Sequence, residues 1–131
     1  MAKADSATKR RNIRLPTQGY DAPYSDAVLV GDTLYISGRV GFLPETGQPP
    51  EDLEEEIRLA LDGVKVVLAA AGMTMEDLVW VQVYCSDVRL FDRFNEVYKT
   101  YFTQSLPARA FVGAGNLLHG AHFQVQGMAV K

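Results

Sequence analysis

The feature that most constrains this chain is a helical stripe of apolar residues in its middle, with a glycine directly after it. Between residues 53 and 71 the apolar side chains recur at steps of three and four, as Leu53, Ile57, Leu61, Val64, Leu68 and Ala71. This spacing predicts a helix that buries one face and ends at Gly72. Glutamates at 54–56 lie in its first turn, where the helix dipole favours negative charge. Because adjacent helical residues do not converge, we interpret them as solvated and not as a metal site.

Residues 79–85 alternate with the period of a strand, which is the second strong pattern. One predicted face carries Val79, Val81, Val83 and Cys85, and the other carries Trp80, Gln82 and Tyr84. Shorter patterns predict further strands at residues 28–30, 33–37, 110–115 and 123–130. The first two of these form a hairpin around Gly31-Asp32. A second helix is expected over residues 90–102, with an aromatic stripe of Phe91, Phe94, Tyr98, Tyr101 and Phe102.

The order of these elements predicts an α+β fold. Strands that alternate with helices need crossover connections, which leave both helices on one face of a mixed sheet. A chain of 131 residues suits one domain. We expect this domain to span residues 20–131, after a flexible basic arm at 1–19. The other sheet face carries tyrosine and glutamine side chains, and such a mixed face favours contact with another subunit over open water.

Charge and composition exclude some function classes and weaken others. The formal net charge is −3, which argues against nucleic acid as a partner, since phosphate binding needs a clustered basic surface. The basic cluster at 9–11 with Arg14 is typical of a solvated tail. We find neither a membrane-spanning apolar stretch nor a secretory signal core. The single cysteine, Cys85, fits a reducing compartment, so we expect the cytoplasm, although the basic N-terminus leaves organelle targeting open.

The segment Leu106-Pro107-Ala108-Arg109 places an arginine at the start of a short apolar run. A guanidinium stays charged and presents a rigid fork of donors, which suits it to bind a carboxylate through two parallel hydrogen bonds. The alternative is an ordinary surface arginine that precedes a strand. The local sequence leaves both open.

Short segments in a characteristic order make the chain resemble the Rid family of reactive intermediate deaminases, also called the YjgF or L-PSP endoribonuclease-like family. They are Pro23-Tyr24-Ser25-Asp26-Ala27-Val28, Tyr35-Ile36-Ser37-Gly38, Pro44-Glu45-Thr46-Gly47, Ala69-Ala70-Ala71-Gly72, Phe94-Asn95-Glu96-Val97-Tyr98 and Leu106-Pro107-Ala108-Arg109. The resemblance implies a chorismate-mutase-like fold with a mixed six-stranded sheet and two helices on one face. It also implies a homotrimer with a ligand cleft at each subunit interface. The implied activity is hydrolysis of 2-aminoacrylate-type enamines and imines to 2-oxo acids and ammonia, with no cofactor or metal.

The resemblance also implies roles for individual residues. Arg109 matches the arginine that grips the substrate carboxylate, Tyr24 a pocket tyrosine, and Ser37-Gly38 the strand end that lines the cleft. A glutamate on the last strand is a candidate to position the attacking water, and here that position is Gln124, with Gln126 as a second amide. Glutamine can hydrogen-bond a water but cannot accept its proton. Three further departures from the family pattern are candidate substrate-binding residues, namely Arg39, Arg89 and Phe111.

Alternative functions therefore remain open. The chain is either an imine deaminase with a shifted substrate range, or a trimer that binds small carboxylates and has lost catalysis. Positioning and charge neutralisation can support hydrolysis without a carboxylate base, because imines hydrolyse readily. A ribonuclease is the least favoured alternative, given the acidic balance and the lack of a regularly spaced histidine pair. We interpret His119 and His122 as a solvent-exposed pair, although a metal or acid–base role is possible.

Overall fold

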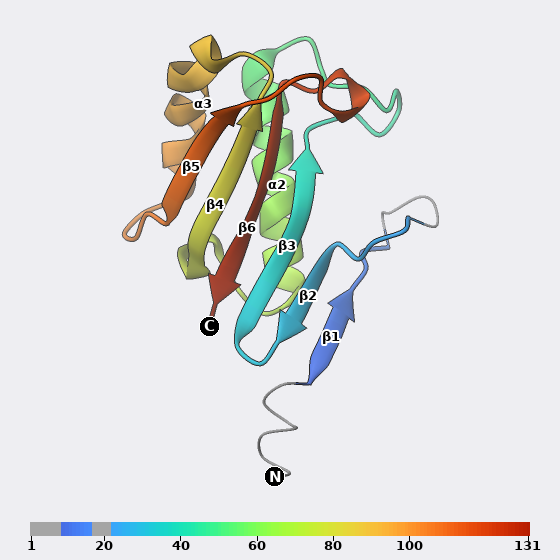
Figure 1. The fold of residues 1–131 in the computed structure, drawn as a ribbon, viewed down its shortest axis with the longest axis vertical. Helices are drawn as coiled ribbons and strands as arrows, with labels where there is room; N and C mark the ends of the chain where they lie inside the picture. Colours follow the sequence, from blue (N-terminus) through green and yellow to red (C-terminus); the bar gives the residue numbers. More distant parts are fainter. Residues whose placement is uncertain (1–8, 17–21) are drawn as a thin grey trace.

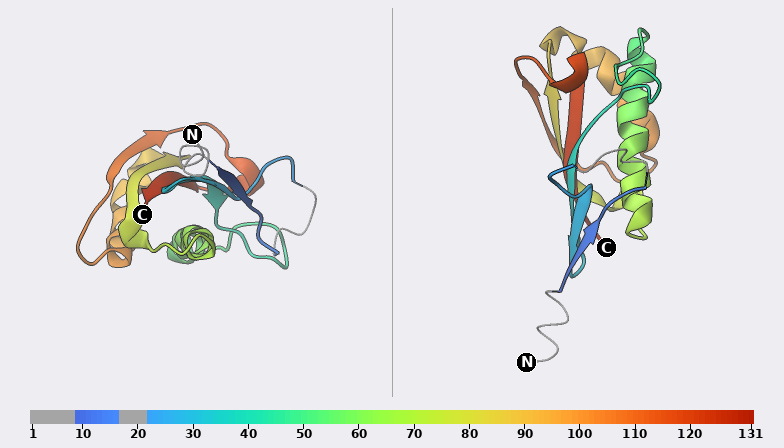
Figure 2. Two further views of the ribbon diagram at one scale, coloured as in Figure 1. Left: turned by 90° about the horizontal axis from the view of Figure 1, so that it is seen from below. Right: turned by 90° about the vertical axis from the view of Figure 1, so that its right-hand side faces the viewer.

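A twisted six-stranded sheet forms one layer of the molecule, and two helices cover one of its faces (Figure 1; Figure 2, right). The computed structural model describes residues 9–16 and 22–131. In chain order the elements are β1 (Arg10–Ile13), β2 (Ala27–Val30), β3 (Thr33–Val40), α2 (Leu53–Ala70), β4 (Leu78–Cys85), α3 (Phe91–Tyr98), β5 (Ala108–Gly113) and β6 (Phe123–Val130). The strand order is β1-β2-β3-β6-β4-β5, with β4 and β5 parallel and the other pairs antiparallel. The predicted mixed α+β fold is confirmed.

Strand β1 is the main departure from the sequence-based expectation, which placed these residues in a flexible arm. Arg10–Ile13 pairs antiparallel with β2, so that Ile13 lies opposite Ala27 and is buried. The Arg11 guanidinium donates a 3.0 Å hydrogen bond to the carbonyl of Ala70, at the end of α2. A single apolar residue in a polar run gives no period to detect, so sequence patterning missed this strand. The other residues of the predicted arm, 1–8 and 17–19, lie outside the described residues.

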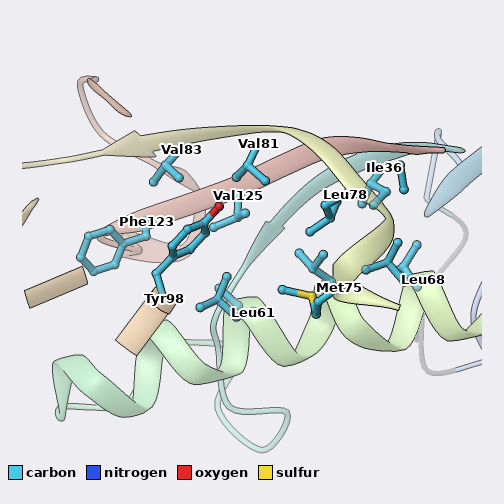
Figure 3. Close-up of a cluster of buried hydrophobic side chains, with 14 of the residues drawn as sticks. Ile36, Leu61, Leu68, Met75, Leu78, Val81, Val83, Tyr98, Phe123 and Val125 are labelled. Atoms are coloured by element: carbon cyan, nitrogen blue, oxygen red, sulfur yellow. The ribbon is translucent and has the colours of Figure 1, made fainter. Parts of the chain in front are cut away.

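The core lies between α2 and the sheet, as the helical stripe predicts. Ile57, Leu61, Val64 and Leu68 are buried, and Figure 3 shows Leu61 and Leu68 facing side chains from the strands. The side chain of Asp52 caps the helix by accepting a 3.3 Å hydrogen bond from the backbone N–H of Glu55. Gly72 follows in the left-handed conformation, with φ of 73°. One expectation here was wrong, because Glu56 is wholly buried and not solvated.

Two apolar residues that the patterns placed in the core are exposed. The β4–β6 register shifts between Leu78 and Trp80, and this irregularity turns Val79 outward while Leu78 is buried. Phe91 begins α3 and is also exposed, whereas Phe94 and Tyr98 are buried as predicted. The helical segment continues beyond α3 as a 3₁₀ turn over Lys99–Tyr101. Local bulges and helix ends therefore account for both errors.

The sheet face away from the helices is rich in exposed aromatic and amide groups, as expected. Tyr35, Trp80, Gln126 and Met128 line a shallow hollow of about 330 Å³ on this outer face. Tyr35 is 49% exposed and Trp80 37% exposed. In the part of the chain that the structure describes, no helix is long and apolar enough to cross a membrane.

Candidate functional site

A bulge in β3 organises the first group of candidate residues. The β3–β6 register shifts between Ile36 and Arg39, so Ser37 and Gly38 together lie opposite Gln126. The Ser37 hydroxyl donates a 2.7 Å hydrogen bond to the carbonyl of Ser25, and its backbone N–H donates to the carbonyl of Asp26 at 3.0 Å. These bonds hold the bulge against the loop that carries Tyr24.

Gln124 packs directly against the bulge. A Cβ atom added at Gly38 would lie 2.6 Å from Gln124 Nε2, so a larger residue here would displace this amide from its present position. Gln124 Nε2 also donates a weak 3.4 Å hydrogen bond to Gln126 Oε1. We call Tyr24, Ser37, Gly38 and Gln124 the bulge cluster. Gly38 and Gln124 are in contact and Ser37 adjoins Gly38 in the chain, so this part of the cluster offers neutral donors and acceptors.

The N-terminal segment holds the Tyr24 loop in place. The Arg14 guanidinium donates hydrogen bonds to the carbonyls of Tyr24 at 2.7 Å and Ala22 at 3.1 Å. Asn12 Nδ2 donates to the Ser25 hydroxyl at 3.0 Å. The Tyr24 side chain itself is half exposed. Sequence reasoning treated Arg14 as part of a solvated tail, because nothing local reveals a contact that folding creates ten residues away.

Arg39 lies beside the bulge cluster but is committed to an internal ion pair. Its Nη1 lies 2.7 Å from Asp26 Oδ1, and Asp26 is almost fully buried. Asp26 Oδ2 also accepts a 2.6 Å hydrogen bond from the backbone N–H of Leu15. The arginine packs against α2, since a Cβ added at Gly63 would lie 3.3 Å from its Nε. Arg39 therefore supports the fold on the helix side of the sheet, and Asp26 is a residue that sequence reasoning missed.

Arg109 lies at the opposite edge of the sheet, among aromatic rings. Its Cζ atom is 4.7 Å from the ring centre of Tyr98, 5.4 Å from that of Phe111 and 5.6 Å from that of Phe91. Such contacts stabilise a guanidinium by about 0.5–2 kcal/mol each. Among the described carboxylates we find no ion pair with this arginine. Its charge is therefore positioned by rings, and its donors stay free for a ligand.

A shallow pocket of about 260 Å³ opens beside Arg109. It is lined by Asn95, Tyr98, Lys99, Leu106, Pro107 and Arg109. Burial raises the pKa of Tyr98 to about 12, against the opposing effect of the Arg109 charge. The Tyr98 phenol is neutral at physiological pH, and its oxygen points into the core toward Val125 (Figure 3). We call Tyr98, Arg109 and Phe111 the arginine cluster.

Arg89 and Phe111 have different surroundings from one another. Phe111 packs edge-on against Phe91, with ring centres 5.0 Å apart, and so forms one wall around Arg109. Arg89 is highly exposed and binds the carboxylate of Asp87 through two of its nitrogens, at 2.8 and 3.0 Å. This pairing lowers the pKa of Asp87 to about 2. The structure therefore gives Arg89 a local partner, and Phe111 a place in the arginine cluster.

The two clusters do not meet within one chain. Arg109 pairs across the sheet with the buried Val81 and faces the helices, whereas Gln124 alternates with buried Phe123 and Val125 and faces outward. Gln124 on β6 is two strands away from β5, about 10 Å at the usual strand spacing, and Ser37 and Gly38 on β3 are three strands away, about 14 Å. One ligand cannot contact both clusters of a single copy.

The histidines at the start of β6 also differ from one another. His119 adopts a φ of 62° and stacks on Phe42, with ring centres 5.1 Å apart. His122 Nδ1 lies 2.8 Å from Glu56 Oε1, while about half of its side chain is exposed. No group of three metal-ligating side chains is found among residues 9–16 and 22–131.

Comparison with known proteins agrees with this fold along nearly the whole domain. The family described as endoribonuclease L-PSP matches residues 18–131. A mouse protein named 2-iminobutanoate/2-iminopropanoate deaminase is 42% identical over 110 residues, covering 83% of this chain and 82% of its own. A RutC family protein of Saccharolobus solfataricus is 38% identical over 110 residues, covering 83% and 87%.

Solved structures lead to the same family. The crystal structure of Escherichia coli TdcF with bound serine has a TM-score of 0.84 and 29% identity, covering 92% of this chain and 99% of that one. The E. coli YjgF structure has a TM-score of 0.85 and 29% identity, covering 92% and 98%. Because its sequence and its fold both match those of this family, the chain belongs to the L-PSP endoribonuclease family, also known as the Rid or YjgF family.

Proposed function

We propose that the protein is a deaminase that hydrolyses 2-aminoacrylate-type enamines and related imines to 2-oxo acids and ammonia. The observation that carries this proposal is Arg109, a cation held by aromatic rings without a described carboxylate partner. A substrate derived from an amino acid supplies that carboxylate. The name of the mouse relative, and the serine bound to TdcF, fit a site for small molecules of this kind.

The working site then lies between copies of the chain. Because the arginine cluster and the bulge cluster face opposite sides of the sheet, a homotrimer can bring one copy's Arg109 to the next copy's Gln124. The exposed aromatic groups on the outer face, Tyr35 and Trp80, suit burial against another copy. Sedimentation equilibrium should give three times the monomer mass, and a stable monomer at micromolar concentration would contradict this assembly.

The proposed reaction depends mainly on orienting the substrate and the attacking water. Arg109 would bind the substrate carboxylate through its fork and neutralise it. The Gln124 amide, packed on Gly38, would hold a water against the imine carbon. Water adds to the C=N bond to form a carbinolamine, and the C–N bond then breaks to release ammonia and leave a carbonyl. No cofactor or metal is required for this sequence of steps.

One observation favours a second function, the binding of small carboxylates without catalysis. Both amides on β6, Gln124 and Gln126, stand where the resemblance implies carboxylates, and an amide cannot accept a proton. A cytoplasmic, reducing location suits either function, since the single Cys85 is buried and free. Nucleic acid remains the least favoured partner, given the net charge of −3.

An ammonia-release assay distinguishes the two functions. Imines are generated in situ from alanine, leucine and glutamate, and the enamine from serine by a dehydratase. We expect the parent protein to accelerate ammonia release from at least one of them. If the protein only binds, the parent will be inactive and Gln124→Glu will create activity, since a positioned base contributes about 10²–10⁴-fold. Arg89→Ala is the matched control, because Arg89 is already paired with Asp87.

A further inference from the structure

The pocket of about 260 Å³ beside Arg109 contains a second cation, which the proposed reaction has not used. Its polar lining comes from Asn95, Lys99 and Arg109, and the remaining walls are apolar. In the proposed reaction Arg109 binds the one carboxylate that every substrate derived from an amino acid carries. The lysine and the amide are then left to contact whatever else the substrate presents.

The helical segment of α3 brings Lys99 and Asn95 to the same side. The backbone N–H of Lys99 donates to the carbonyl of Asn95, so helical hydrogen bonding extends as far as this lysine. Residues four apart lie on one face of a helix. That face meets the segment that leads into β5, since Leu106 and Arg109 line the same pocket. Two elements of secondary structure therefore place an ammonium, an amide and a guanidinium around one hollow.

Lys99 already binds a carboxylate, and it does so weakly. Its Nζ lies 2.7 Å from Glu96 Oε2, and both side chains are 67% exposed. The hydrogen bond from Lys99 and the lysine charge lower the pKa of Glu96. An exposed pair three residues apart on a helix contributes little to stability, because water and salt screen it. A carboxylate supplied by a ligand can therefore replace Glu96 at Lys99 with little loss.

The other cations that the sequence suggested for the site have stronger partners elsewhere. Arg39 is paired with the buried Asp26, and Arg89 binds Asp87 through two nitrogens. Neither arginine is among the described residues that line the pocket beside Arg109. Lys99 is the additional cation that the structure places there.

We infer that this pocket is a subsite for the second carboxylate of a dicarboxylic imine, such as the imine derived from glutamate, and that Lys99 selects it. The inference rests on the proposed deaminase function. Arg109 binds the carboxylate next to the C=N carbon. Lys99, assisted by an N–H of the Asn95 amide, binds the carboxylate at the far end. The methylene groups between them lie against the apolar walls. Lys99 is thus a specificity-determining residue that does not touch the reacting atoms.

Titration calorimetry of glutarate and its monoamide tests the subsite without turnover. The two compounds match in shape, and only glutarate carries the second charge. We expect the parent to bind glutarate about fivefold more tightly than the monoamide, as a partly exposed ion pair gives, and Lys99→Met to bind both equally. Lys99→Arg should keep the preference.

The matched control is Arg93→Ala. It removes an exposed charge from the same helix, at a residue that is not among the described residues lining the pocket, and should leave the preference unchanged. A parent without a preference for glutarate, or a preference that persists in Lys99→Met, would overturn the subsite.

The ammonia-release assay gives the corresponding kinetic test with imines derived from glutamate and leucine. We expect Lys99→Met to raise KM for the glutamate-derived imine about fivefold with kcat little changed, and to leave both constants for the leucine-derived imine as in the parent. Glu96→Gln should lower KM for the glutamate-derived imine, because it removes the competing carboxylate.

The outcomes separate the subsite from the deaminase function. An active parent whose KM for the glutamate-derived imine is unchanged in Lys99→Met would overturn the role of Lys99 while the deaminase proposal stands. A parent that releases no ammonia, but whose preference for glutarate depends on Lys99, would overturn the deaminase function and leave the dicarboxylate subsite in place.

Discussion

The bulge cluster and the arginine cluster are built in opposite ways. Around Ser37 and Gly38 the structure relies on hydrogen bonds to backbone carbonyls and on the missing side chain of a glycine. Around Arg109 it relies on the faces of aromatic rings, with contacts of 4.7 to 5.8 Å to four of them. The first arrangement fixes neutral polar groups in space, and the second holds a charge without neutralising it. A substrate with a charged end and a neutral reacting centre matches both.

The largest effect should come from Arg109. Arg109→Ala should weaken binding of small carboxylates by about 2–5 kcal/mol, because a desolvated pair of charge-assisted hydrogen bonds is lost. Arg109→Lys should restore little of this, since a point charge cannot reproduce the fork. Titration calorimetry measures both variants. If Arg109→Ala binds small carboxylates as tightly as the parent does, the arginine cluster is not the carboxylate-binding site.

Removing the buried carboxylate beside the bulge should cost stability. Asp26→Ala leaves Arg39 without its 2.7 Å partner in a partly buried position. We expect the free energy of unfolding to fall by about 3 kcal/mol, the lower end for a broken buried pair, because Arg39 keeps some access to water. Urea denaturation measures this change. Asp32→Ala, at an exposed hairpin turn, is the matched control and should stay within about 0.5 kcal/mol of the parent.

The fit between Gly38 and Gln124 predicts a compensating pair of changes. Gly38→Ala should lower stability by about 1–3 kcal/mol, because its Cβ would overlap the Gln124 amide at 2.6 Å. Gln124→Ala in the same chain should recover most of that loss without restoring ammonia release. Thermal unfolding of the four proteins forms a double-mutant cycle. Additive effects would show that the amide does not occupy the space above Gly38.

The smallest effect concerns the loop that leads to Arg109. Backbone N–H groups of Thr103 and Ser105 donate to the Glu76 carboxylate, at 2.9 and 3.0 Å, and lower its pKa below the usual 4.5. A lowered folded-state pKa gives a contribution that is complete above the unfolded-state value near 4.5 and is lost as pH falls through the folded-state value. Amide exchange at 103–105 should therefore speed up on acidification below pH 4.5, relative to its intrinsic rate.

Glu76→Gln should remove most of this pH dependence, and the exposed Glu45→Gln should leave it unchanged. If the amides of Thr103 and Ser105 show the same protection in the parent and in Glu76→Gln at neutral pH, the carboxylate does not hold the loop.

Local patterns predicted the parts of the molecule that local physics determines. The helical stripe at 53–71 and the alternation of Phe123, Val125 and Gly127 against Gln124 and Gln126 are confirmed, because each residue's side follows from its own backbone period. The exposure of Val79 could not be predicted, since the irregularity that turns it outward depends on pairing with β6.

Contacts between distant segments were beyond the sequence patterns for the same reason. The buried Glu56 is bonded by a residue 66 positions away in the chain, since its Oε1 lies 2.8 Å from Nδ1 of His122. No local pattern marks Asp26 as a buried residue, because its partners, the Arg39 guanidinium and the Leu15 N–H, lie more than ten residues away on either side. The role of Arg109 was open from local sequence, and the rings that surround it come from α3 and β5 together.

The placement of β1 has a practical consequence for anyone who shortens or processes this chain. A protease cut after residue 19 would leave Tyr24, Ser37, Gly38 and Gln124 all present. It would remove Arg14, which holds the carbonyls of Ala22 and Tyr24, and Asn12, which holds Ser25. It would also uncover the edge of β2, a row of unpaired backbone groups that invites strand addition by other chains. The shortened protein would then lose the contacts that hold the Tyr24 loop and gain a tendency to aggregate.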